Sequence, residues 1–453
     1  MAREKEVKRI DEHGKGFLKG ALWIAVGGFT AKVIGALYRI PLTNLIGGYG
    51  LGLYQLVYPV YCLLLTVSAT GIPSSIAKLT AEKIGRKQST MPLFKTAMKL
   101  FLLIGITGTA IMAASAPFLS KAQGSESVLG GYFALAPSVV FVSAISVFRG
   151  WFQGRNDMAP TAFSEITEQV VKVGFGLLFA YLYRGNVEKA VIFLLLSVSI
   201  SELFTLFLMI LLFKRVKNNE KFKNERGRYA MKSVLRMSIP VTFNSLLLPL
   251  SGLLDSVLVP RFLSAYTTDA VTLFGLFSGG AVTVINLPVS VCYGLAAASV
   301  PRVSAAAALG GVERKTVRKR VFSALGLTAL ISGVAAVGLY LFAEPAAKII
   351  FRSLKGEELQ TLIGLIKTFS ISAFTLSCVQ TLSACLTAQG KPQYAAISML
   401  IAVIVKTALY PVLLKSPEIS VFGVAQATNV CYLVAFLLDL VYNLVITRRK
   451  RLQ

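Results

Sequence analysis

Basic side chains lie deep inside long apolar stretches of this chain. Lys32, Lys172 and Lys406 each interrupt a stretch of about twenty mostly apolar residues, and Arg39 lies near the end of the first. A charge in membrane hydrocarbon costs several kcal/mol unless it faces protein, water or a partner, so these residues are candidates for a functional site. Ammonium and guanidinium groups bind phosphate oxygens closely. We therefore expect at least two of the lysines to face an aqueous cavity that takes an anion such as a pyrophosphate.

Four acidic residues in similar positions could carry a coupling ion or relay charge. Glu165, Glu168 and Lys172 are spaced i, i+3, i+7 and share one helix face, on which Glu168 and Lys172 could form an ion pair. Glu202 and Asp255 lie inside two further apolar stretches. A structural ion pair, or a protonated acid that is hydrogen-bonded between helices, would explain the same residues, and both interpretations stay open.

Two other charged residues lie near the predicted cytoplasmic ends of their stretches. Arg149 and Asp439 are within a few residues of charged or polar segments. Side chains in such places commonly reach the membrane surface. We expect both to act as anchors there rather than as ligands.

Residues for metal or nucleophilic chemistry are scarce. His13, in the charged N-terminal tail, is the single histidine, and the five cysteines lie in apolar stretches without a CxxC pair. The predicted cytoplasmic loops contain no DxD motif of the kind a glycosyl or phosphoryl transferase would need. We expect no enzymatic activity, no metal and no cofactor.

The composition requires a membrane environment. Of the 453 residues, 55% are apolar and 15% are charged, the mean hydropathy is +0.68, and an ordinary soluble domain has about 25% charged residues. The sequence predicts an all-α polytopic membrane protein with about twelve transmembrane helices. The predicted spans are 17–38, 51–77, 96–118, 128–148, 160–183, 187–213, 234–262, 271–300, 321–342, 359–388, 394–414 and 419–446.

Charge sets the predicted orientation. The formal net charge is +26, and Lys and Arg concentrate in both tails and in alternate loops. Cytoplasmic loops carry this excess, so both termini are expected to be cytoplasmic and the basic segments to face anionic lipid rather than nucleic acid. The apolar stretch that begins near Phe17 has no cleavage pattern, and we expect it to be an uncleaved first span.

The chain is expected to consist of two related halves. Gln153-Gly154 and Gln389-Gly390 head corresponding spans, and Lys172 and Lys406 follow each at nearly the same depth. Two like-oriented bundles predict a site between them that opens alternately to each side. The predicted divisions are a cytoplasmic tail (1–16), a six-helix lobe (17–213), a basic cytoplasmic linker (214–233), a second six-helix lobe (234–446) and a basic tail (447–453).

Several segments resemble one family of membrane proteins. They are RGWFQGRNDMAP (149–160) with SEITEQVVK (164–172), GIPSSIAK (71–78) and LTAQGKP (386–392). These segments resemble the stage V sporulation protein B-like polysaccharide exporters, within the multidrug/oligosaccharidyl-lipid/polysaccharide (MOP) superfamily. The resemblance implies a V-shaped pair of six-helix lobes in a bacterial plasma membrane. Many members carry about fourteen spans against about twelve here, so it does not specify a peptidoglycan precursor.

The resemblance and the basic residues predict a flippase. It would move an undecaprenyl-pyrophosphate-linked oligosaccharide or cell-wall precursor to the outer leaflet, with Lys32, Arg39, Lys172 and Lys406 as candidate substrate-binding residues. H⁺ or Na⁺ could couple through the acids named above. The alternative is a multidrug and toxin extrusion cation antiporter of the same architecture, in which Glu165, Glu168, Glu202 and Asp255 carry the ions.

Overall fold

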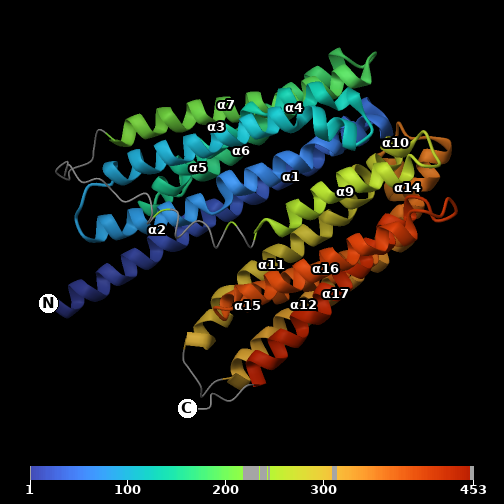
Figure 1. The fold of residues 1–453 in the computed structure, drawn as a ribbon. Coiled ribbons are helices and arrows are strands. Elements are labelled where there is room, and N and C mark those ends of the chain that lie inside the picture. Colours follow the sequence, from blue (N-terminus) through green and yellow to red (C-terminus); the bar gives the residue numbers. More distant parts are fainter. Residues whose placement is uncertain (1, 218–233, 235–241, 243–244, 309–313, 449–453) are drawn as a thin grey trace. The chain divides into compact units, whose positions relative to one another are not determined.

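A computed structural model describes residues 2–217, 234, 242, 245–308 and 314–448 of the chain (Figure 1). All regular structure in these residues is helical, as the sequence predicts. Within them, nine helical stretches are long and apolar enough to cross a membrane by length and composition. One of these stretches, Val33–Gly85, has 53 residues and covers the whole of the predicted span 51–77 and the last part of 17–38. Each predicted span overlaps a helix, and the total of about twelve crossings stays a prediction.

The chain divides into two compact units, described separately here. The first unit comprises residues 1–45, 57–120 and 126–249, and the second comprises 46–56, 121–125 and 250–453. The predicted lobe boundaries stay predictions, since residues 218–233 of the linker and 449–453 of the basic tail lie outside the described ranges. The orientation of both termini likewise stays a prediction.

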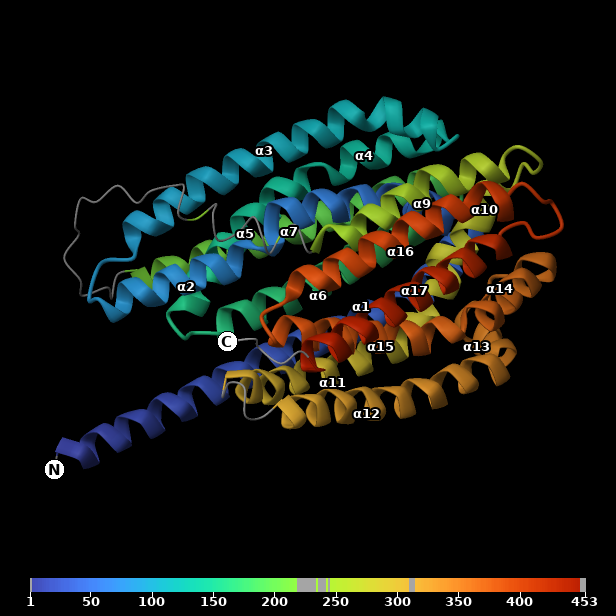
Figure 2. The same ribbon diagram turned by 60° about the horizontal axis from the view of Figure 1, so that its bottom comes forward.

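The first unit is built mainly from α1 to α7. In Figures 1 and 2, α5, α6 and α7 run side by side. The helices are α1 (Ala2–Leu65), the π-helical turn η1 (Thr66–Thr70), α2 (Ile72–Gly85), α3 (Met91–Ala122), the short turn η2 (Glu126–Val128), α4 (Leu129–Leu135), α5 (Pro137–Gly154), α6 (Ala159–Leu182) and α7 (Val187–Lys217).

Two glycines of α5 let its backbone touch α2. A Cβ atom on Gly150 would lie 2.8 Å from the Pro73 carbonyl oxygen, and one on Gly154 would lie 2.5 Å from that of Ala77. Neither distance is one that a side chain tolerates, so the small-xxx-small spacing of the RGWFQG motif sets the approach of the two helices. Next to Gly150, the indole N–H of buried Trp151 donates to Thr90 Oγ1 at 2.9 Å.

Unit 2 contains α9 to α17, of which α15, α16 and α17 lie side by side (Figures 1 and 2). The elements are α9 (Leu247–Leu263), α10 (Ala270–Gly275), the π-helical turn η3 (Leu276–Ala281), α11 (Val282–Ala308), α12 (Arg314–Leu341), α13 (Ala343–Ile350), α14 (Gly356–Phe369), α15 (Ile371–Ala388), α16 (Pro392–Leu413) and α17 (Phe422–Arg448).

A close backbone contact ties part of α1 into this second unit. α1 kinks at Gly47, whose φ of 67° lies in the left-handed region that favours glycine. One turn later, a Cβ atom on Gly52 would lie 2.1 Å from the Val271 carbonyl oxygen, and one on Gly275 would lie 2.4 Å from the Gly52 nitrogen. The glycine-rich segment 47–52 therefore packs directly on α10.

Outward faces of the helices are apolar. On α12, Leu327, Leu330, Val334 and Val337 are exposed at i, i+3, i+7 and i+10. Only 11% of the apolar window of this helix is fully buried, so much of this face lies outside the helix bundle. A continuous apolar stripe of this kind suits hydrocarbon and would not suit water.

We expect Gly150→Leu to destabilise the folded protein, because the new side chain must push α5 away from the α2 backbone. Overpacking of this kind costs about 1–3 kcal/mol or more. The matched control is Gly338→Leu on α12, where nothing lies within 4 Å of the new Cβ atom, and its effect should stay within about 0.5 kcal/mol. Thermal unfolding of the purified proteins in detergent measures both. Equal melting temperatures for the two variants would contradict the assigned contact.

Candidate functional site

The acidic face predicted on α6 is present, but Glu168 does not take the predicted partner. Arg149 on α5 donates from Nη2 to Glu168 Oε2 at 3.1 Å, and its Nε donates to Ser164 Oγ at 2.8 Å. The side chains of Arg149 and Glu168 are 15% and 22% exposed. Arg149, expected to be a surface anchor, is instead the ion-pair partner of Glu168. Two helices joined by a loop of four residues bring these groups together.

Lys172 is left without a close counter-charge. It lies one turn beyond Glu168 and is half-buried. No carboxylate among the described residues lies within ion-pair distance of its ammonium group. Its longer-range electrostatic neighbours are Glu168, Glu202, and the guanidinium of Arg39 on α1. A half-buried cation with this environment can accept an anionic ligand.

Glu202 lies in the middle of α7, which packs along α6. Its side chain is 3% exposed, and the Tyr61 hydroxyl donates a hydrogen bond to it. The second carboxyl oxygen, Oε2, has no hydrogen-bond partner within the part of the chain that the structure describes. Arg149 and Lys172 act on it electrostatically. The first unit thus brings together Arg39, Lys172 and Glu202 from three helices. The sequence predicted the first two as substrate-binding residues and the third as a coupling residue.

The remaining candidates of the first unit lie where α1 packs on α6. A Cβ atom on Gly28 would lie 3.4 Å from Glu165 Oε2, so this carboxylate faces α1. Lys32 is on α1 one turn beyond Gly28, but its side chain lies outside the described residues. Glu165 and Arg39 are both half-buried. The roles predicted for these residues stay predictions.

Lys406 and Asp255 form a buried ion pair in the second unit. Lys406 Nζ lies 2.7 and 2.8 Å from the two oxygens of Asp255 and donates to Ser251 Oγ at 2.5 Å. The Tyr410 hydroxyl donates to Asp255 Oδ1 at 2.6 Å. Lys406 is 2% and Asp255 16% exposed. The structure therefore brings together two residues for which the sequence predicted separate roles, and it satisfies the ammonium group in place.

Asp439 is the residue whose environment differs most from expectation. Its side chain is fully buried, so the prediction of a surface anchor is wrong. Distance along the chain from the end of α17 was a poor guide, because α15 and α16 cover this turn of the helix. The position of an aspartate within an apolar stretch was a signal available in the sequence, since charges in such stretches are rare and commonly functional.

Two carboxyl groups outside the predicted spans have a raised pKa. Burial raises the pKa of Asp157, in the turn between α5 and α6. Burial and the nearby Asp269 raise the pKa of Glu358 at the start of α14. In the described residues, no group of three or more His, Cys, Asp and Glu side chains could hold a metal ion.

Comparison with known proteins places the chain in a family. A family model described as polysaccharide biosynthesis protein matches residues 17–307. The chain belongs to this family. It is 27% identical over 426 residues to stage V sporulation protein B of Bacillus subtilis, covering 91% of this chain and 80% of that protein. It is 22% identical over 450 residues to the lipid II flippase MurJ of the same organism, covering 93% and 81%.

The fold is that of a transporter superfamily. An inward-facing multidrug resistance MATE family transporter of the MOP superfamily matches with a TM-score of 0.77 at 17% identity, over 91% of this chain and 94% of that one. The predicted resemblance to sporulation protein B and to this superfamily is confirmed. This member of the polysaccharide biosynthesis family is a multi-pass membrane protein, and the relatives named here with a stated activity are a flippase and a transporter rather than enzymes.

We expect Asp255→Asn to lower the stability of the folded protein, because it leaves the Lys406 ammonium group buried without a counter-charge. Removing one partner of a buried pair costs about 3–5 kcal/mol. The double variant Asp255→Asn/Lys406→Met should recover most of the loss, because no charge then remains. Denaturation in detergent measures the free energy of unfolding of all three proteins. A double variant no more stable than Asp255→Asn would contradict a charge-pairing role.

Glu358 allows a test of pH dependence. Because its pKa is raised in the folded state, its ionised form disfavours folding, so stability is present at acid pH and is lost as pH rises through the folded pKa. Glu358→Gln should therefore raise the melting temperature slightly at pH 8 and leave it unchanged at pH 4. The exposed neighbour Glu357 provides the control Glu357→Gln. A melting temperature that Glu358→Gln lowers at pH 8 would refute the assigned cause.

Proposed function

We propose that the protein is a flippase for a polyprenyl-pyrophosphate-linked oligosaccharide or cell-wall precursor. It would carry the polar headgroup from the inner to the outer leaflet of a bacterial plasma membrane by alternating access, while the lipid tail stays in hydrocarbon. Both termini would be cytoplasmic, in keeping with the basic tails and loops. No covalent step is needed, so the task of the protein is to bind and shield the diphosphate.

The observation that carries this proposal is the state of Lys172. It is half-buried deep in α6, without an ion-pair partner among the described residues, and Arg39 is near it. An unpaired cation within a span costs several kcal/mol, and a diphosphate bound there would offset that cost. The ammonium and guanidinium groups would replace part of the hydration of the phosphate oxygens.

Relatives support the same class of substrate. The family is one of polysaccharide biosynthesis, and the lipid II flippase of Bacillus subtilis matches over most of both chains. An undecaprenyl-pyrophosphate-linked sugar therefore agrees with the chemistry of the basic residues. A gradient of H⁺ or Na⁺ would drive the cycle.

A cation antiporter of the multidrug and toxin extrusion type is the second candidate. The buried carboxylate of Glu202 favours it, because an acid with one oxygen unpaired among the described residues can take up a proton or a cation. In that case acids such as Glu165, Glu168 and Asp255 would share the ion-carrying role, and Lys172 would be dispensable. The shared fold supports either substrate class.

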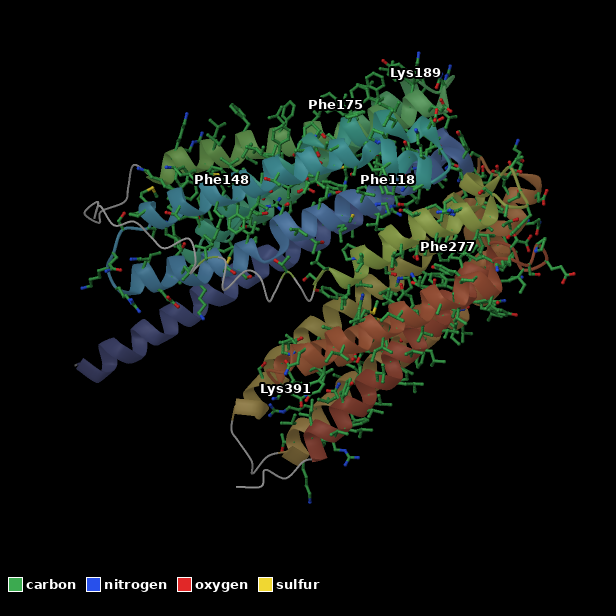
Figure 3. The ribbon with its side chains drawn as sticks, in the orientation of Figure 1. Phe118, Phe148, Phe175, Lys189, Phe277 and Lys391 are labelled. Carbon is green, nitrogen blue, oxygen red and sulfur yellow. The ribbon has the colours of Figure 1, made fainter. Side chains whose placement is uncertain are left out.

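Reconstitution in liposomes with a fluorescent undecaprenyl-pyrophosphate-linked oligosaccharide tests the proposal. We expect wild-type protein to accelerate translocation and Lys172→Ala to slow it about 10- to 100-fold, the loss of one charge-assisted hydrogen bond. Lys172→Arg should keep most activity. Lys189→Ala is the matched control, because Lys189 is exposed at the start of α7 (Figure 3).

The outcomes separate the two candidates. Absence of translocation by wild-type protein would refute the flippase proposal. Full activity of Lys172→Ala would show that Lys172 does not bind the substrate. The antiporter would be established instead by dye efflux from the same liposomes, if Glu202→Gln abolishes this efflux and Lys172→Ala leaves it unchanged.

A further inference from the structure

A buried polar cluster surrounds Asp439 in the second unit, away from the Lys406–Asp255 pair. The Asp439 side chain is fully buried. Ser383 on α15 donates to its Oδ2 at 2.5 Å, whereas Oδ1 receives no hydrogen bond from the described residues. The hydroxyl of Ser398 on α16 also lies at the carboxyl group. Three helices thus meet at one acid.

The unpartnered oxygen bears on the protonation state of Asp439. Oδ1 is buried and receives no hydrogen bond from the described residues, whereas Oδ2 accepts from Ser383. A buried carboxylate with one oxygen unsatisfied loses much of the solvation of its charge. A proton on that oxygen removes the charge.

The first half of the chain contains a counterpart of Asp439. Glu202 and Asp439 are 237 residues apart, compared with 236 for Gln153 and Gln389 and 234 for Lys172 and Lys406. Each acid lies on the last helix of its half, is 3% or less exposed, and has one oxygen without a hydrogen-bond partner in the described residues. The internal repeat therefore places a buried carboxyl group in both halves.

Only the first half supplies cations to its acid. Arg149 and Lys172 act on Glu202, whereas the interactions of Asp439 come from Ser383 and Ser398 and include no charged residue among the described ones. The counterpart of Lys172, Lys406, is already paired with Asp255. An isolated carboxylate in such a place costs far more than a neutral carboxyl group.

Other titratable groups on the helices that pack against α17 are not among the interactions of Asp439. On α16, Tyr410 donates to Asp255, and the Tyr394 ring packs against Tyr442 of α17. The titratable groups described on α15 are thiols, which lie in apolar surroundings. The titratable groups of α14 are near the other end of α17, since Asn429 donates to the Thr368 carbonyl oxygen.

The first turns of α12 carry basic side chains. Val317 and Val321 of these turns pack with Phe436 and Leu440 of α17. Arg320 is half-buried, and the other basic side chains described there are exposed. The remaining groups are Cys378 and Cys385 on α15, Glu357, Glu358 and Lys367 on α14, Lys315, Arg318, Lys319, Arg320 and Tyr340 on α12, and Cys431 and Tyr432 on α17 itself.

We propose that Asp439 is a proton-binding site of the second half. The proton sits on Oδ1, while Oδ2 accepts from Ser383. Binding neutralises the acid, and release leaves a carboxylate that the surrounding side chains do not compensate. A proton needs one oxygen, whereas a metal ion needs several, and the described residues offer no second carboxylate here.

A polar path leads from this cluster to the end of the unit. Asn443 donates to the Asp439 carbonyl oxygen at 2.8 Å, and Gln389 donates to Asn443 Oδ1 at 2.9 Å. Gln389 is half-buried, and the following Gly390 and Lys391 are exposed in the turn between α15 and α16 (Figure 3). Protons would exchange through this turn, which belongs to the LTAQGKP segment.

Infrared difference spectroscopy of the full-length protein in detergent tests the site directly. We expect wild-type protein at neutral pH to show a protonated-carboxyl band that Asp439→Asn lacks and that disappears at alkaline pH. Asp269→Asn, at an exposed carboxylate outside the spans, is the control and should keep the band. Identical spectra of wild type and Asp439→Asn would overturn the proposal. Loss of the band on adding Na⁺ at fixed pH would overturn the choice of a proton.

A second variant covers the case in which Asp439→Asn does not fold. Ser383→Ala removes the hydrogen bond that Oδ2 accepts, so the band should shift to the position of a less strongly hydrogen-bonded carboxyl group. Ser377→Ala, at a buried serine that donates to the Ala373 carbonyl oxygen within α15, is its control and should not shift it. A band unchanged by Ser383→Ala would contradict the assigned geometry.

The role of the proton in transport rests on the proposed function and has its own measurement. We expect translocation by wild-type protein to change with pH across the range in which the infrared band titrates, and Asp439→Asn to flatten that profile. If Asp439→Asn shows the same pH profile of translocation as wild-type protein, Asp439 takes no part in coupling. Absence of any translocation would refute the flippase and leave the infrared result intact.

Discussion

Charge inside a span must be neutralised, hydrogen-bonded or used, because hydrocarbon offers no water to solvate it. The described residues show the first two outcomes. Glu168 is neutralised by Arg149 at 3.1 Å, and Lys406 is both neutralised and hydrogen-bonded by Asp255 and Ser251. Lys172 has neither, and this difference makes it the strongest candidate for use.

The two compact units meet this constraint in different ways. In the first, acids and bases share one cluster, so that Glu202 has cations near it. In the second, Asp255 pairs with the lysine, and the interactions of Asp439 come from hydroxyl groups. The first unit thus holds a mixed charge cluster and the second holds separated groups. Under the two proposals, the first unit binds the anion and the second binds the proton.

The sequence predicts the elements of this protein better than the contacts between them. Apolar runs of about twenty residues identify helices because their length is fixed by the bilayer, and the i, i+3, i+7 spacing correctly puts Glu165, Glu168 and Lys172 on one face of α6. The partner of Lys406 could not be found in this way, since Asp255 is 151 residues distant in the chain. Local spacing also favoured Lys172 over Arg149 as the partner of Glu168, because it carries no information about a neighbouring helix.

Glycine positions also show that the sequence predicts spacing within a helix but not the neighbour against which the helix packs. The spacing of Gly150 and Gly154 is visible in the sequence, but that α2 provides the backbone against which they fit is a property of the fold. Depth estimates failed for Asp439 for a related reason. Its distance from the end of α17 was known, whereas the covering of that turn by α15 and α16 was not.

Under the proposed function, a substrate that must leave again would explain why acids lie within electrostatic range of Lys172. Transport requires binding that is favourable enough for entry and weak enough for release. Arg39 and Lys172 alone would hold a diphosphate tightly in a medium of low dielectric constant. With Glu168 and Glu202 within electrostatic range of Lys172, part of that attraction is cancelled, and a change in the protonation of Glu202 would alter how much. The mixed cluster is thus better suited to a passing anion than a purely basic one.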